Sequence, residues 1–168
     1  AAHKLQESGF SVCILERAVN KSTNNFDSFS YNQMINQYKH GGISSTLGNT
    51  KISYVEGSTL GGGSEVNSGL YHRTPPAILD HWKNDFGLKD SSSSSLEKDF
   101  LEIEKNLCIS FFPKGKIPKA SLKLKEGADN KGWKVEEVPR WFNYDNSMTG
   151  AGKKMTMQST YLKEYIDN

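Results

Sequence analysis

The sequence predicts an α/β fold that begins with the second half of a βαβ nucleotide-binding unit. Three observations carry this prediction: a helix-then-strand pattern over residues 1–16, a run of glycines within residues 57–63, and two amphipathic helical stripes within residues 76–107. Apolar residues spaced three and four apart indicate a helix, and a short apolar run between turns indicates a buried strand. The chain has 168 residues, a length typical of about one domain.

Residues 1–16 follow the order helix, turn, strand, acid. Gly9 stands where a helix ends, and the apolar residues after it predict a buried strand: Phe10, Val12, Cys13, Ile14 and Leu15. In a βαβ unit the acid at the end of the second strand binds the ribose hydroxyls, about 20 residues after a glycine-rich turn. Glu16 stands at that position and is a candidate ribose ligand; a solvated strand end is the alternative. We expect the first strand and its glycine turn to precede Ala1.

The glycine cluster follows a strand-like run at residues 51–57 and is the most specific feature of the chain. Three successive glycines, Gly61 to Gly63, cost backbone entropy and contribute no side chain to packing. We expect them where the backbone takes unusual dihedrals or lets a ligand approach, with amide N–H groups and the Ser64 hydroxyl as donors. A flexible surface loop is the alternative, but the apolar residues around the glycines favour a ligand site: Leu60, Val66 and Leu70.

Two segments resemble the N-terminal FAD-binding part of the glucose-methanol-choline (GMC) oxidoreductases. The first is Ala1 to Glu16. The second, Gly57 to Arg73, matches more specifically, because it is in step with the family's GG-x-S-x-x-N motif and following Arg: Gly61, Gly62, Ser64, Asn67 and Arg73. The ending Arg73-Thr74-Pro75 resembles the branch that includes long-chain alcohol oxidases. Residues 150–155 and 160–162 are also similar to the family.

The resemblance implies a partial Rossmann-like FAD/NAD(P)-binding domain, followed by the beginning of an α+β substrate domain. The FAD-binding part would cover residues 1–110, with an excursion at 19–50, and the substrate-binding region would start at 111–168. Glu16 would bind the adenosine ribose. The other cofactor-binding candidates would line the pyrophosphate and the flavin ring: Thr59, Leu60, Gly61, Gly62, Gly63, Ser64, Asn67, Ser68, Gly69 and Leu70.

The resemblance further implies an FAD-dependent oxidoreductase that acts on CH–OH groups and transfers a hydride to the flavin. The substrate would be a small-molecule alcohol, or a sugar or choline-like compound; the electron acceptor is not predicted. The family's catalytic His, with a partner His or Asn, is expected beyond Asn168, so the chain alone would be inactive. Without the first strand, the glycine turn and the return strands, its unpaired sheet edges and exposed apolar surface would also make it poorly soluble. Two alternatives stay open: a non-catalytic nucleotide-binding or interaction module, and an inactive truncated product.

Composition argues against several other classes of protein. The 21 Lys and Arg residues nearly balance 19 Asp and Glu, and the net charge of +2 gives no strongly basic face for nucleic acid. The cysteines, Cys13 and Cys108, cannot form a four-thiolate zinc site, and each is expected to be a buried structural thiol. No metal-ligand cluster or serine nucleophile motif is present. No apolar run approaches the roughly 20 residues that span a bilayer, and no secretion signal is visible, so we expect a cytoplasmic protein.

Further elements are predicted from local patterns. Pro76 starts a helix that Gly87 ends. A second amphipathic helix carries the stripe Leu96, Phe100, Ile103 and Leu107 after a polar linker at 91–95. Three weaker patterns predict a short helix over 31–38, a strand over 133–141 broken at Pro139, and a helix from residue 160 onward. The lysine-rich run at 114–125 reads as a solvated face.

Overall fold

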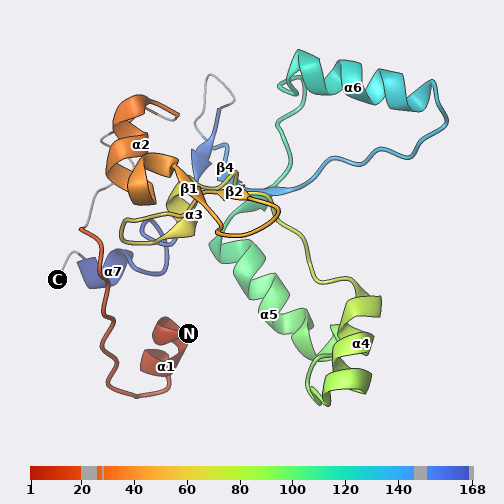
Figure 1. The fold of residues 1–168 in the computed structure, drawn as a ribbon. Helices are drawn as coiled ribbons and strands as arrows, with labels where there is room; N and C mark the ends of the chain where they lie inside the picture. Colours follow the sequence, from red (N-terminus) through yellow and green to blue (C-terminus); the bar gives the residue numbers. More distant parts are fainter. Residues whose placement is uncertain (20–25, 28, 146–150, 167–168) are drawn as a thin grey trace. The chain divides into compact units, whose positions relative to one another are not determined.

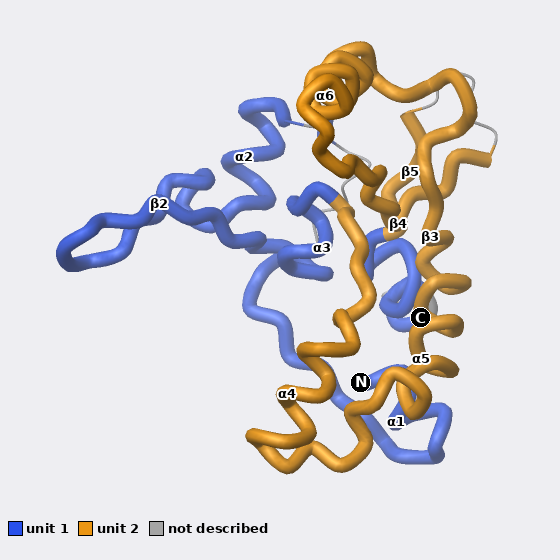
Figure 2. The backbone as a smooth tube through the Cα atoms, turned by 90° about the vertical axis from the view of Figure 1, so that its right-hand side faces the viewer, with its two compact units in different colours: residues 1–68, 156–168 blue, residues 69–155 orange. Residues whose placement is uncertain are grey.

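The computed structural model describes residues 1–19, 26–27, 29–145 and 151–166 (Figure 1). The chain divides into two compact units, coloured separately in Figure 2. Unit 1 comprises residues 1–68 and 156–168, and unit 2 comprises residues 69–155. These units are defined by packing, whereas the expected FAD-binding and substrate-binding parts are defined by role. That division by role stays a prediction.

Unit 1 is built from short helices and one small hairpin. Its described elements are α1 (Ala2–Glu7), α2 (Tyr31–Gln37), the 3₁₀ turn η2 (Lys39–Gly42), β1 (Ser44–Ser45), β2 (Ser53–Tyr54), α3 (Gly63–Val66) and α7 (Lys163–Ile166). The predicted helices at residues 1–8 and 31–38 are confirmed. The strand-like run at 51–57 forms a strand only at β2, which pairs antiparallel with β1.

Helix α1 ends as its sequence predicts. Gly9 has a φ of 85° and donates its N–H to the carbonyl of Gln6, while the N–H of Phe10 bonds to the carbonyl of Leu5. These two hydrogen bonds form a Schellman motif, which satisfies helix carbonyls that would otherwise lack partners. Glycine suits this position because a positive φ costs it little.

The predicted buried strand at residues 10–15 is wrong. The segment forms no strand, and its apolar side chains are exposed; Leu15 is 93% exposed and Phe10 is 61% exposed. A buried parallel strand requires a hydrogen-bonded neighbour on each side, and no described residue pairs with this segment. Cys13 is therefore exposed, contrary to the expectation of a buried thiol, and Cys108 is half-buried.

The end of helix α2 fixes the chain where it enters the glycine cluster. The Ser30 hydroxyl caps α2 by accepting the N–H of Gln33, and buried Gln33 and Gln37 side chains bond to each other. The Gln37 carbonyl then accepts the N–H of Ser58 at 2.7 Å. Gly57 also forms a bridge with Tyr38. Residues 57 and 58 are thus tied to the end of α2.

Unit 2 contains three longer helices and a three-stranded antiparallel sheet. Its described elements are α4 (Pro76–Phe86), α5 (Ser93–Asn106), β3 (Ile109–Ser110), α6 (Lys119–Asp129), β4 (Arg140–Asn143) and β5 (Lys153–Lys154), and the strand order is β3-β4-β5. Both predicted helices, α4 and α5, are confirmed, and Gly87 ends α4 with a φ of 69°. Leu79 of α4 and Leu107 after α5 are the buried apolar side chains among the described residues.

Two local expectations in unit 2 need correction, and one helix was not predicted. Residues 93–95 of the expected linker at 91–95 form the start of α5, because the Ser92 hydroxyl accepts the N–H of Ser95 and caps the helix. The expected strand at 133–141 begins only at Arg140, since Pro139 has no N–H for a ladder. The lysine-rich run is exposed, as expected, and its second half lies in α6, a helix that was not predicted.

The coarse expectation of mixed helices and strands is confirmed, and the Rossmann-like sheet is not seen. All strand pairs and bridges among the described residues are antiparallel. A Rossmann-like sheet is mostly parallel.

Candidate functional site

The candidate site is the glycine turn, residues 57–63, with the short helix α3 that follows it. Gly62 donates its N–H to the Thr59 carbonyl at 2.8 Å, which closes a tight turn. Gly61 has a φ of 85°, and Gly62 has φ 56° and ψ −133°. Residues that carry a Cβ rarely tolerate positive φ. The prediction of unusual dihedrals at these glycines is therefore confirmed.

The glycines of the turn differ in what surrounds them. A Cβ on Gly57 would lie 2.5 Å from the Gly62 carbonyl oxygen, and a Cβ on Gly61 would lie 2.5 Å from the Glu65 carboxylate oxygen Oε1. These two glycines allow the turn to pack against itself. A Cβ on Gly62 or Gly63 would meet no protein atom within 4 Å. The backbone at 62–63 therefore borders open space, which is the condition for close approach of a ligand.

Three polar side chains are buried beneath the turn: Thr59, Ser64 and Glu65. The Ser64 hydroxyl donates to the Gly61 carbonyl at 2.8 Å and accepts the N–H of Met157 at 3.0 Å. The expected donor to a ligand is therefore engaged within unit 1. Glu65 Oε1 accepts the N–H of Gln158 at 3.3 Å. Neither Glu65 nor residues 157–158 were predicted, because nothing local in the sequence marks two segments 93 residues apart as neighbours.

The next four predicted ligands, residues 67–70, are divided between the two units. Asn67 and Ser68 follow α3 and are exposed, and Asn67 donates its N–H to the Gly63 carbonyl. Gly69 and Leu70 belong to unit 2; a Cβ on Gly69 would overlap the Trp141 indole, so this glycine is required for packing.

Glu16 is exposed, and its carboxylate accepts the N–H of Ala18 at 2.8 Å. In the described part of the chain no strand precedes it, and no hydrogen bond or ion pair joins it to the glycine turn. Its expected role as a ribose ligand stays a prediction.

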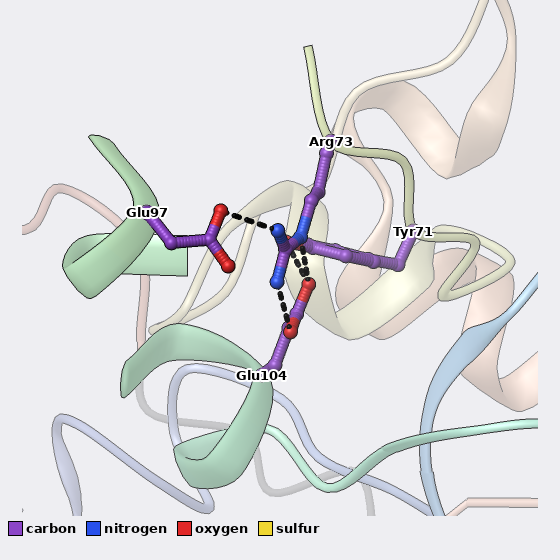
Figure 3. Close-up of polar contacts among 4 residues, drawn as sticks. All are labelled: Tyr71, Arg73, Glu97 and Glu104. Carbon is purple, nitrogen blue, oxygen red and sulfur yellow. Dashed lines mark hydrogen bonds and ion pairs between the residues drawn. The ribbon is translucent and has the colours of Figure 1, made fainter. Parts of the chain in front are cut away.

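Arg73, the arginine of the family-like motif, lies in a separate ionic cluster of unit 2. Figure 3 shows its guanidinium between two carboxylates of α5. Arg73 Nε and Nη2 bond to Oε1 and Oε2 of Glu104 at 2.6 and 2.8 Å, and Nη1 bonds to Glu97 at 2.8 Å. The Tyr71 hydroxyl donates to Glu104 at 3.1 Å. We call these four residues the arginine clamp.

The clamp shifts the pKa of its members. The hydrogen bonds from Arg73 lower the pKa of Glu104, although partial burial opposes them, and the Tyr71 hydroxyl adds a smaller lowering effect. The carboxylates of Glu104 and Glu97 raise the pKa of Arg73. Burial, followed by the hydrogen bond to Glu104, raises the pKa of Tyr71. Because each nitrogen of the guanidinium bonds to a carboxylate of α5, Arg73 holds the segment after Leu70 against that helix.

The described residues show neither a metal site nor a membrane-spanning helix. They contain no group of three or more His, Cys, Asp and Glu side chains suited to hold a metal ion. Within the same ranges, no helix is both long enough and apolar enough to cross a bilayer.

Comparison with known proteins identifies the family. The GMC oxidoreductase family model matches residues 34–167. An uncharacterized GMC-type oxidoreductase of Sinorhizobium fredii is 26% identical over 99% of the chain, which covers 34% of that protein. Two long-chain-alcohol oxidases of Arabidopsis thaliana are similar: one is 25% identical over 100% of the chain, covering 23% of that protein, and another is 30% identical over 83% of the chain, covering 18%.

The chain thus spans about a third or less of the length of these relatives. No solved structure matches it significantly. Because the family model covers most of its length, the chain belongs to the GMC oxidoreductase family.

Proposed function

We propose that this chain supplies part of the FAD site of an oxidoreductase that oxidises the CH–OH group of an alcohol. One observation carries the proposal: the backbone at Gly62 and Gly63 borders open space, at a turn whose dihedrals only glycine adopts readily. A planar ring or a pyrophosphate needs such an approach, because any side chain would hold it away from the backbone. The residues present therefore fit the cofactor.

Each predicted ligand has a proposed role in that site. The backbone of residues 59–63, which includes Leu60, would contact the pyrophosphate and the flavin. Asn67, Ser68, Gly69 and Leu70 would continue along the isoalloxazine, and Glu16 would bind the ribose. Since the Ser64 hydroxyl already bonds to the Gly61 carbonyl and to the Met157 N–H, its proposed role is to hold the turn in shape.

When bound, FAD supplies the chemistry by accepting a hydride from the carbinol carbon. The protein's part in such a reaction is to bind and orient the cofactor, while the electronic change occurs in the cofactor itself. The alcohol class is proposed from relatives named long-chain-alcohol oxidases. A small-molecule alcohol is thus the proposed substrate.

The substitution Gly62→Val tests the proposal. In the protein that carries this chain, we expect FAD affinity to fall about tenfold or more, because valine would fill the space that the cofactor needs and would strain a positive φ. FAD affinity is measured by titrating the apoprotein and following flavin fluorescence. The yellow colour of the purified protein gives a second measure.

Gly41→Val is the matched control. Gly41 also has a positive φ of 62°, and a Cβ there would meet no atom within 4 Å, but this glycine lies outside the glycine turn. The variant reproduces the backbone strain without blocking the proposed site, so it should keep its flavin. Stoichiometric flavin in Gly62→Val would contradict the proposed site, and absence of FAD binding by the wild-type protein would contradict the proposed function.

A further inference from the structure

The carboxylate of Glu65 is the least expected group in the candidate site. Its residue is 1% exposed, and it lies in the first turn of α3, directly after the glycine turn. Burying a carboxylate costs free energy that burying an apolar side chain does not. The contacts of Glu65 Oε1 show that this oxygen accepts hydrogen bonds from neighbouring groups.

Ser64 and Glu65 bind consecutive amides of one distant segment, residues 156–159. Ser64 Oγ accepts the N–H of Met157 at 3.0 Å, and Glu65 Oε1 accepts the N–H of Gln158 at 3.3 Å. The segment is itself a hydrogen-bonded turn, because the Thr156 carbonyl accepts the N–H of Ser159. Thr156 is also buried. Two neighbouring side chains of α3 thus hold a second turn in place.

The same carboxylate lies against the glycine turn. A Cβ on Gly61 would be 2.5 Å from Glu65 Oε1, and the Ser64 hydroxyl lies 3.3 Å from that oxygen. Glu65 therefore contacts the turn on one side and the 156–159 segment on the other. One side chain thus joins the two segments.

We infer that Glu65 is a positioning residue that links the glycine turn to the 156–159 segment and so holds the turn in the shape that receives FAD. The identity of the cofactor in this inference rests on the proposed function, whereas the link between the two segments does not depend on it. Glu65 makes the link by accepting a hydrogen bond at Oε1. The side chain need not touch the cofactor.

Two substitutions with side chains of similar size test whether Glu65 acts by accepting a hydrogen bond or only by filling space. Glu65→Gln keeps an oxygen acceptor in the same place, whereas Glu65→Met keeps the length of the side chain and removes the acceptor. In the full protein that carries this chain, without added FAD, we expect Glu65→Met to speed hydrogen exchange at the Gln158 amide about tenfold. Glu65→Gln should restore near wild-type exchange.

Ser64→Ala provides a second, smaller change in case Glu65→Met fails to fold. It should speed exchange at Met157, the partner of Ser64, more than at Gln158. The exposed substitution Glu7→Gln on α1 is the control and should change neither amide. Unchanged exchange at Gln158 in Glu65→Met, or at Met157 in Ser64→Ala, would overturn the link.

FAD titration of the same variants tests the second half of the inference. We expect Glu65→Met to weaken FAD binding about tenfold and Glu65→Gln to bind within about twofold of the wild type. Wild-type affinity in Glu65→Met, despite faster exchange at Gln158, would overturn the role of Glu65 in the cofactor site. A wild-type protein that binds no FAD would instead overturn the proposed function, while the exchange measurement still decides the link.

Discussion

At the scale of single residues, the glycine turn combines positions with different physical requirements. Gly57 and Gly61 are needed because the turn packs against itself, whereas Gly62 is needed because of its dihedrals and leaves open space beside it. The sequence predicted unusual backbone conformations within the run Gly61 to Gly63, and Gly61 and Gly62 have positive φ. It could not separate the two causes, because the atoms that approach Gly61 come from Glu65, whose burial depends on the distant residues 157 and 158.

The partners of Arg73 in the arginine clamp could not be predicted from the sequence either. Arg73 was recognisable from its motif, but its partners Glu97 and Glu104 lie 24 and 31 residues further along the chain. No local pattern pairs them. Their packing on one side of α5 brings both carboxylates to the guanidinium, and a charge-assisted, two-point ion pair results.

The clamp predicts a pH dependence of stability. The pKa of Glu104 is lowered in the folded protein, so its stabilising contribution is present above the ordinary glutamate pKa of about 4.3 and is lost as the pH falls through the folded value. Glu104→Gln should therefore lower Tm by roughly 2–4 °C at pH 7. The difference from wild type should shrink as the pH is lowered below about 4.

Thermal unfolding followed by circular dichroism, from pH 7 to pH 3, measures this difference. Glu126→Gln on α6 is the control, because its carboxylate pairs with Lys123 at an exposed site where ion pairs contribute little. A Tm difference for Glu104→Gln that stays constant over the whole pH range would contradict the prediction.

At the scale of elements, helices whose ends carry local signals were predicted well. Gly9 ends α1 and Pro76 and Gly87 bound α4, because each signal acts through the backbone of its own neighbours. The strand expected at residues 10–15 failed because a strand depends on a partner. Helix α6 was missed for another reason: the lysine-rich run was interpreted only as a solvated face, although Lys, Leu, Glu and Ala favour helices intrinsically.

The start of α5 gives a prediction for one element. Ser92 caps the helix by accepting the N–H of Ser95 at 3.1 Å. Ser92→Ala should therefore destabilise the folded unit by about 1 kcal/mol, and Ser92→Asp should restore most of that loss, because aspartate is also a good N-cap residue. Chemical denaturation measures the free energy of unfolding.

Ser93→Ala is the matched control for the cap, because Ser93 is an exposed residue in the first turn of the same helix. It should be neutral or slightly stabilising, since alanine favours helices more than serine. Equal effects of Ser92→Ala and Ser93→Ala would show that Ser92 contributes through helix propensity and not as a cap.

At the scale of the whole molecule, the resemblance of two segments to the GMC oxidoreductases predicted the family, and local patterns predicted the mixture of helices and strands. The Rossmann-like sheet is not seen among the described residues, and no local segment encodes the long-range strand pairing that such a sheet requires. The described strands pair as short antiparallel ladders, and much of the apolar sequence forms no buried layer. Leu15 and Phe10 are the clearest cases, since both were expected in a core strand and both are exposed.

This exposed apolar surface predicts the behaviour of the 168-residue chain prepared by itself. Contiguous apolar patches drive association, and unpaired extended segments pair with other chains. We expect the chain to enhance the fluorescence of the dye ANS and to show a sedimentation coefficient that rises with concentration. The double substitution Phe10→Ser and Leu15→Ser should reduce both effects, because it removes two large side chains that are 61% and 93% exposed.

A matched change on a short exposed polar segment, Ser93→Ala, should alter neither the dye fluorescence nor the sedimentation coefficient. A chain that stays monomeric at all concentrations without binding the dye would contradict the expectation.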